Sequence, residues 1–169
     1  MPSKHSNFIF RVAIVLMLVF ISSCGGAPSD SETAPESSSG VIAKNSSYSS
    51  PIAISDDDSL IVVANTLNST VSLINVAGDA NTKLTEVQVG EEPRSVVITP
   101  NKAFAYVTNQ VSGTVSVIDL NSQTKVTDIT VGAEPYGIAL TPDGTRAYVA
   151  NSASNTVSII DTTTNTVIG

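Results

Sequence analysis

Short runs rich in Val, Ile and Thr, separated by turn residues, fill the chain from residue 51 onward. Short β-branched runs bounded by turn signals predict β-strands. No window in this region places apolar residues at the helical spacing of 3.6, and β-branched residues stand where a helix would favour Leu, Ala and Glu. We therefore expect an all-β fold.

These strand-like runs belong to a repeat. Tyr148 follows Tyr106 at an offset of 42 residues, whereas Asn65 precedes Asn109 by 44 in a looser first unit. Each unit holds four runs, which in the second unit occupy residues 94–99, 103–108, 114–119 and 125–131. A repeat of this length and strand number is typical of a β-propeller blade. We predict blades of four antiparallel strands, in units at about residues 51–90, 91–132 and 133–169.

Turn residues separate the predicted strands. Residues 141–144 read Thr-Pro-Asp-Gly, which predicts a type I turn with Gly at its end. Asn109 and Asn151 close the second strand of their units, where we expect a left-handed backbone or an Asx turn. Gly113 and Asn155 provide a second permissive position before the third strand.

The N-terminal 24 residues carry an export pattern. A basic start precedes an uncharged apolar run at residues 12–21, which is shorter than the ~20 residues that span a bilayer. A membrane helix starting at Phe8 is the alternative, but Arg11 interrupts it. Ile-Ser-Ser before Cys24 resembles the lipobox of bacterial lipoproteins, in which the cysteine is acylated. The resemblance implies a signal peptide at residues 1–23 and lipidation of Cys24.

The same resemblance implies a location for the mature protein. Gly25 rather than Asp follows the cysteine, which favours the outer membrane or the cell surface. Residues 24–50 are dominated by Ser, Gly, Pro and acids, a composition that predicts a flexible tether between the lipid and the folded part. We expect an exported protein anchored to a bacterial membrane.

Charge and histidine content narrow the chemistry. The net charge is -7 and Lys and Arg are not clustered, so we expect no nucleic-acid partner. The only histidine is His5, inside the segment that we expect to be removed. A mature chain without histidine has no imidazole base and no imidazole ligand, which disfavours a haem or copper propeller.

The repeat also carries a recognisable motif. Residues 106–109 read Tyr-Val-Thr-Asn and residues 114–119 read Thr-Val-Ser-Val-Ile-Asp. This sequence resembles the YVTN β-propeller repeat family across about residues 51–169. The resemblance implies an exported propeller, related to surface-layer proteins and to lactonase-type and nitrite-reductase-type propellers. Many such proteins look like binding or scaffold modules.

Candidate site residues follow from the meander topology. Loops between blades and loops between strands two and three should emerge on one face, with Gln110 and Ser112 beside the candidates. Carboxylates there could bind a polar ligand or a cation, or act as acid and base. The alternative is that the repeated Glu-Pro pair only forms the crossover. The ligand-binding candidates are Glu91, Glu92, Arg94, Glu134 and Tyr136.

A run of acids supplies a weaker candidate. Asp56, Asp57 and Asp58 could hold Ca²⁺, although their spacing does not match a calcium loop and a solvated turn is the simpler interpretation. We expect no other cofactor.

Two functional hypotheses remain open. The main one is a lipid-anchored extracytoplasmic binding or scaffold module for a protein or a polar small molecule, without catalysis. The alternative is a lactonase-like hydrolase that uses carboxylates and Ca²⁺. Residues 51–169 hold only about 2.8 blades, whereas closed propellers need about four to eight. We expect an incomplete propeller from a truncated reading frame, with self-association as the alternative.

Overall fold

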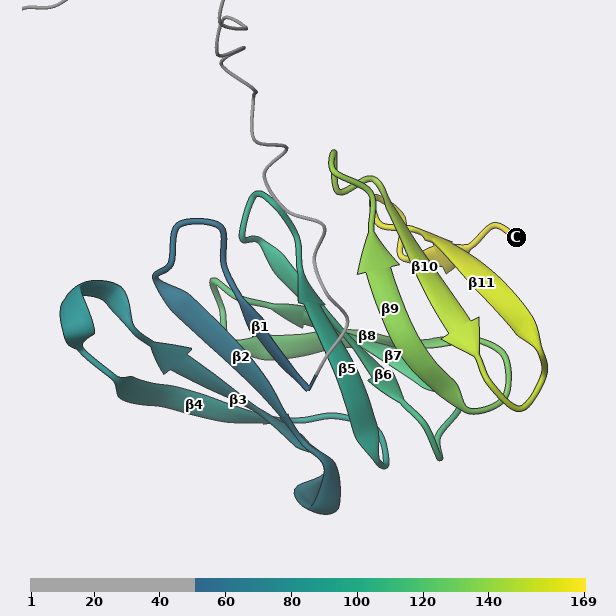
Figure 1. Cartoon of the computed structure of the whole chain (residues 1–169), viewed down its shortest axis with the longest axis horizontal. Coiled ribbons are helices and arrows are strands. Elements are labelled where there is room, and N and C mark those ends of the chain that lie inside the picture. Colours follow the sequence, from purple (N-terminus) through teal and green to yellow (C-terminus); the bar gives the residue numbers. More distant parts are fainter. Residues whose placement is uncertain (1–50) are drawn as a thin grey trace, which may run out of the picture. The chain divides into compact units, whose positions relative to one another are not determined.

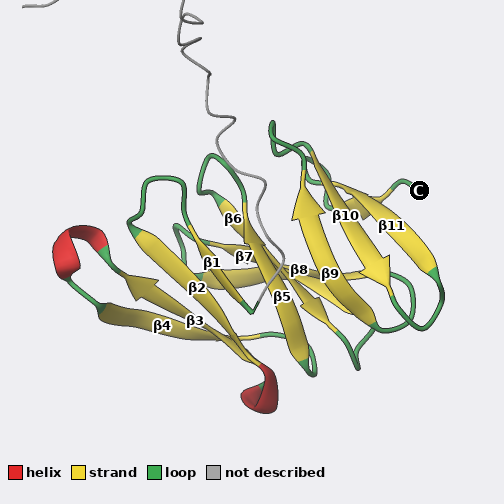
Figure 2. Ribbon diagram, viewed as in Figure 1, coloured by secondary structure: helices red, strands yellow, loops and turns green. Residues whose placement is uncertain are grey.

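Three four-stranded antiparallel sheets make up the computed structural model, which describes residues 51–169 (Figures 1 and 2). Blade 1 contains β1 (Ile52–Ile54), β2 (Leu60–Asn65), β3 (Thr70–Asn75) and β4 (Thr82–Gln88). Blade 2 contains β5 (Pro93–Ile98), β6 (Phe104–Asn109), β7 (Thr114–Asp119) and β8 (Thr124–Thr130). Blade 3 contains β9 (Pro135–Leu140), β10 (Arg146–Asn151), β11 (Thr156–Asp161) and β12 (Thr166–Val167). Two short 3₁₀ turns, η1 (Thr66–Asn68) and η2 (Ala77–Asp79), lie in blade 1.

Each blade is a simple meander, because its four strands are hydrogen-bonded in sequence order. The first strands lie next to each other, β5 contacting both β1 and β9. The fourth strands also meet, β8 contacting both β4 and β12. The blades therefore stack face to face with their strands in the same order, which is the propeller arrangement that the repeat predicts.

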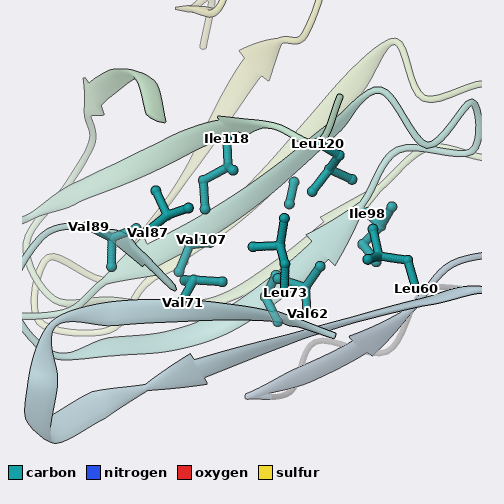
Figure 3. Packing of buried hydrophobic residues seen from close by; sticks show 12 residues of the cluster. Leu60, Val62, Val71, Leu73, Val87, Val89, Ile98, Val107, Ile118 and Leu120 are labelled. Carbon is teal, nitrogen blue, oxygen red and sulfur yellow. The ribbon is translucent and has the colours of Figure 1, made fainter. Parts of the chain in front are cut away.

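Two hydrophobic clusters fill the spaces between the blades. The first joins blades 1 and 2 and includes Val62, Leu73 and Val107 (Figure 3). The second joins blades 2 and 3 and includes Tyr106 and Ile138. Since successive side chains of a strand point to opposite faces, both faces of blade 2 are apolar and both are covered. Burial of each Val or Ile side chain contributes about 1.5–3 kcal/mol, so the stability of a blade depends on its neighbours.

The strand and turn predictions are confirmed to within one residue in unit two. The turn at residues 141–144 also forms as predicted, because the Gly144 N–H donates to the Thr141 carbonyl at 2.8 Å and Gly144 has φ +70°. Gly113 and Asn155 have φ of 64° and 52°, which confirms them as the permissive positions.

The interpretation of Asn109 and Asn151 as left-handed turn residues is wrong. Both lie at the end of a strand with only 0% and 2% of their surface exposed. The Asn109 Nδ2 donates to Thr114 Oγ1 at 3.0 Å and to Ser116 Oγ at 2.9 Å. The amide thus ties the second strand of the blade to the third, and the left-handed position falls later in the loop.

The expectations for the N-terminal part lie outside the described residues. These are the signal peptide at residues 1–23, the tether at residues 24–50 and the lipidation of Cys24. Between residues 51 and 169, no helix has the length and apolar character needed to cross a bilayer.

Candidate functional site

The crossovers between blades and the loops after the second strands meet at one end of the strands, as the meander topology predicts. The Gln110 N–H, after β6, donates to the Glu92 carbonyl of the crossover into blade 2 at 2.9 Å. The Ser152 N–H, after β10, donates to the Glu134 carbonyl of the next crossover, also at 2.9 Å. We call this end the crossover rim; it comprises residues 89–92, 131–134, 66–69, 110–113 and 152–155 with the first residues of β5 and β9.

Glu92 and Glu134 shape the crossovers. Both have left-handed backbones, with φ of 52° and 51°, and both precede a proline that opens the innermost strand. Pro cannot donate to the ladder and so fits the first position of a strand. The repeated Glu-Pro pair therefore has the structural role that the sequence offered as an alternative. The two glutamate carboxylates still project into the rim, where the Glu92 carboxylate pairs with the guanidinium of Arg94.

Arg94 and Tyr136 occupy β-bulges at the start of the innermost strands. Pro93 pairs with Asn109 and Ser95 with Thr108, so Arg94 is the extra residue between them. The same shift in blade 3 leaves Tyr136 as the extra residue. These two residues are equivalent at the 42-residue offset, yet one is Arg and the other Tyr. A bulge re-aims one side chain, and bulges are over-represented next to active sites.

A chain of polar side chains crosses from blade 2 to blade 3. The Arg94 guanidinium donates to Glu92 Oε2 at 2.8 Å and, through Nε, to Gln110 Oε1. The Gln110 Nε2 in turn donates to Glu134 Oε2 at 3.3 Å. We call these four residues the rim network. The side chains of Arg94 and Glu92 are 35% and 45% exposed, so a solute can reach both charges, and the ion pair itself adds little stability.

The remaining two candidates flank this network. The Glu91 N–H donates to Ser112 Oγ at 2.7 Å, and Glu91 is exposed. The Tyr136 carbonyl accepts from Thr108 Oγ1 at 2.9 Å, and its residue is 55% exposed. Gln110, placed only beside the candidates in sequence, is the residue that links the Arg94–Glu92 pair to Glu134 of the next crossover. The sequence signal that could have identified Gln110 is a difference between repeats, because Ser152 occupies the equivalent position at the 42-residue offset.

The run of acids lies at the opposite end of the strands, in the β1–β2 loop. Asp57 accepts from the Lys102 ammonium at 2.6 Å and from the hydroxyls of Ser55 and Ser59 at 2.6 and 2.7 Å. Lys102, followed by these hydroxyls, holds the pKa of Asp57 well below its usual range.

This contact weighs against the calcium interpretation. The Lys102 ammonium already pairs with the Asp57 carboxylate, which is the group that would have to bind Ca²⁺. Among residues 51–169, no three or more His, Cys, Asp and Glu side chains are grouped so as to hold a metal ion. Asp56, Asp57, Asn101 and Lys102 instead line a shallow pocket between the loops of blades 1 and 2.

The sequence matches the model of a known protein family. The sequence model described as "Lactonase, 7-bladed beta-propeller" matches residues 24–131. No curated protein sequence matches the chain. The family match supports the lactonase-like alternative better than the scaffold hypothesis.

Solved structures agree on the fold. A hydrazine synthase chain from Kuenenia stuttgartiensis aligns with a TM-score of 0.66 and 31% identity, over 77% of this chain and 37% of that one. A putative 6-phosphogluconolactonase from Bacteroides fragilis aligns with a TM-score of 0.62 and 19% identity, over 69% of this chain and 36% of that one. The dihydro-heme d1 dehydrogenase NirN aligns with a TM-score of 0.59 and 15% identity, over 73% and 28%. The chain therefore spans well under half the length of these matched chains.

Proposed function

Because the chain belongs to the lactonase family of seven-bladed β-propellers, we propose that it forms part of a hydrolase that opens lactone rings. The observation that carries this proposal is the family match over residues 24–131. The rim network supplies the polar groups that such a reaction needs, in a part of the fold where side chains from two blades converge.

Lactone hydrolysis needs a base and a group that stabilises negative charge. Water adds to the ring carbonyl carbon and gives up a proton, and the carbonyl oxygen becomes negative. The ring C–O bond then breaks, and the ring oxygen takes a proton to give a hydroxy acid, which releases its acid proton to solvent and leaves a hydroxy carboxylate. A carboxylate is a suitable base for the water, and a fixed guanidinium stabilises the developing oxyanion.

The rim network offers one residue for each task. Arg94 is held in place from two sides, by Glu92 and by Gln110, so its charge is oriented before a substrate arrives. Glu134 is exposed and contacts Gln110, which places a second carboxylate near the guanidinium. We assign Arg94 to the carbonyl oxygen and Glu134 to the attacking water. Glu92 positions the guanidinium.

The ligand that fits this face is small, polar and able to accept hydrogen bonds from Arg94. Sugar lactones, with several hydroxyl groups and in some cases a phosphate, have this chemistry. The exposed ring of Tyr136 lies at the equivalent bulge of the next blade and offers an apolar surface on which a sugar ring can stack.

The test is a lactone assay on the full chain with matched variants. Hydrolysis of δ-gluconolactone and its 6-phosphate is followed by acid release in a pH-stat. Arg94→Ala should lower kcat/KM by about 100-fold, the size expected for one lost oxyanion donor. Glu134→Gln should lower kcat by a similar factor. Arg146→Ala, in an arginine at the opposite end of blade 3, is the control and should leave the rate unchanged.

Two results would contradict the proposal. One is no turnover above the uncatalysed rate by folded protein. The other is turnover that survives both Arg94→Ala and Glu134→Gln.

We also propose that the protein is exported and held on a membrane through acylated Cys24. Several acyl chains, at about 0.8 kcal/mol per buried CH₂, anchor a protein stably. Cys24→Ala should release the protein from the membrane fraction and abolish labelling by a palmitate analogue, whereas Ser29→Ala should change neither. Unlabelled wild-type protein would overturn this proposal.

A further inference from the structure

The buried hydroxyl of Thr108 joins the two bulges that carry the candidate site. Thr108 lies near the end of β6, and none of its surface is exposed. The Ser95 N–H donates to Thr108 Oγ1 at 3.0 Å, and Thr108 Oγ1 donates to the Tyr136 carbonyl at 2.9 Å. The Ser95 carbonyl lies farther from the same oxygen, at 3.4 Å, so the hydroxyl proton is directed to Tyr136.

This hydroxyl holds backbone groups of both bulges. Ser95 directly follows Arg94, the extra residue of β5, and Tyr136 is the extra residue of β9. A bulge disrupts the ladder locally, so backbone groups beside it need other partners. One side chain thus fixes the N–H that follows the Arg94 bulge and the carbonyl of the Tyr136 bulge.

A blade does not need this hydroxyl in order to form. Ala64 stands at the equivalent position 44 residues earlier, and Ala150 stands at the equivalent position 42 residues later. Blade 3 nevertheless forms the same bulge, with the register shift directly after Ala150. Among these three equivalent positions within residues 51–169, only Thr108 has a hydroxyl. Its role therefore goes beyond building the sheet.

Thr108 lies between two other side chains that are directed toward blade 3. These are Tyr106, which packs in the cluster between blades 2 and 3, and Gln110, which donates to Glu134. A spacing of two places side chains of a strand on one face. Thr108 lies two residues further into the sheet than Gln110 and is fully buried, so solvent does not compete for its two hydrogen bonds.

We propose that Thr108 is a positioning residue of the lactonase site, and that it holds the Arg94 guanidinium and the Tyr136 ring in a fixed relative position. The inference rests on the proposed function, from which it takes the task of each side chain. Arg94 acts on the carbonyl oxygen in the transition state, and Tyr136 stacks on the bound ring. Loss of the hydroxyl lets both bulges shift, which lowers kcat through Arg94 and raises KM through Tyr136.

The first test is lactone hydrolysis by the full chain with Thr108 replaced. Thr108→Val keeps the branched shape and removes the hydroxyl, and should lower kcat/KM about tenfold, with kcat and KM both affected. Thr108→Ser keeps the hydroxyl and should restore most of the rate. Thr99→Val is the matched control. The Thr99 hydroxyl is also buried and bonded to backbone, at Phe104, but lies at the other end of β5.

A double variant separates positioning from stability. Arg94→Ala removes the side chain that Thr108 positions. Thr108→Val added to Arg94→Ala should therefore cause little further loss of kcat, whereas two independent defects would multiply. An effect of Thr108→Val on kcat that is equally large in both backgrounds overturns the proposal.

A second measurement does not depend on catalysis. The chain contains no tryptophan, so Tyr136→Trp places a single tryptophan at the exposed bulge of β9. The fluorescence anisotropy of this tryptophan reports how firmly position 136 is held. Thr108→Val should lower the anisotropy, whereas Thr108→Ser and Thr99→Val should not.

The two measurements distinguish failure of this inference from failure of the proposed function. Folded wild-type protein without turnover contradicts the proposed function, and the anisotropy then decides alone whether Thr108 positions the bulge. Equal turnover in wild type and Thr108→Val, with unchanged anisotropy, contradicts the inference and keeps the proposed function. An equal fall in rate for Thr99→Val and Thr108→Val also contradicts the inference, since both variants then act only through stability.

Discussion

Blades 2 and 3 share strand order, turn chemistry and the buried asparagine, yet their equivalent side chains differ sharply in burial. Tyr106 is fully buried, whereas Tyr148 is 38% exposed. Val115 and Val157 show the same contrast, at 0% and 57%. The difference does not come from the residues, which are identical, but from the neighbour: within residues 51–169, blade 2 is covered on both faces and blade 3 on one.

This contrast separates two kinds of stabilisation in a repeat protein. Hydrogen bonds within a sheet stabilise a single blade, whereas apolar burial depends on two adjacent blades. Stability is then approximately a sum of terms for each repeat and terms for each interface. The same substitution in two blades reports on one kind or the other.

The largest effect is expected at the interface between blades. Tyr106→Ala removes a buried ring and its hydrogen bond to Asn165, and should lower the free energy of unfolding by about 3–5 kcal/mol. Tyr148→Ala should change it by less than about 1 kcal/mol. Denaturant unfolding of the full chain at low protein concentration measures both. Equal losses would show that burial against a neighbour is not what distinguishes the blades.

An intermediate effect is expected inside the blades. Asn109→Ala and Asn151→Ala each remove the amide that joins the second strand to the third, at a cost of about 1–3 kcal/mol. Here the two losses should agree within about 0.5 kcal/mol, because the bonds do not involve the neighbouring blade. Asn121→Ala, in an exposed turn, is the control. A much smaller loss for Asn151→Ala would mean that the blades depend on their neighbours even for internal bonds.

The smallest effect depends on pH. Burial, and secondarily the negative charge of Asp161, raise the pKa of Tyr106 to about 12. An unfolded tyrosine has a pKa of about 10, so the unfolded state loses its proton first as the pH rises. The stability that the protein gains from the raised pKa of Tyr106 is fully present below pH ~10 and is lost between pH ~10 and ~12. At pH ~11 the loss is about 1 kcal/mol.

Tyr106→Phe isolates this pH effect, since it removes the ionising group and keeps the ring. The difference in unfolding free energy between wild type and this variant should be constant at pH 7–9 and should shrink toward pH 11. A difference that does not change with pH would show that Tyr106 titrates as in the unfolded chain.

The strands and turns of the fold are predictable from local pattern. Residues 114–119 are located without error, and the other strands of unit two shift by a single residue. The Thr-Pro-Asp-Gly turn is also predictable, because its conformation depends on the residues within it. Asn109 is the instructive failure. Its backbone preference suggested a turn, whereas its side chain bonds Thr114 and Ser116 on the next strand.

The candidate site is only partly predictable for a similar reason. The topology brings Glu92, Arg94 and Glu134 to one rim, as expected. The bulge that sets Arg94 apart depends on the pairing of Pro93 and Ser95 across two strands, and no local pattern encodes it. The exposure of Tyr148 is equally invisible in sequence, since it depends on which surface lies opposite.

The bulge also has an evolutionary consequence. Arg94 and Tyr136 pair with no residue on the adjacent strand, so the ladder places no demand on the identity of either side chain. A blade with this bulge presents toward the rim one position whose side chain the ladder does not constrain. A substitution at this position in each blade can then change the ligand preference while the pairing of the strands is kept. Repeats with nearly the same sequence can therefore differ, at this one position, in the contacts that they offer to a ligand.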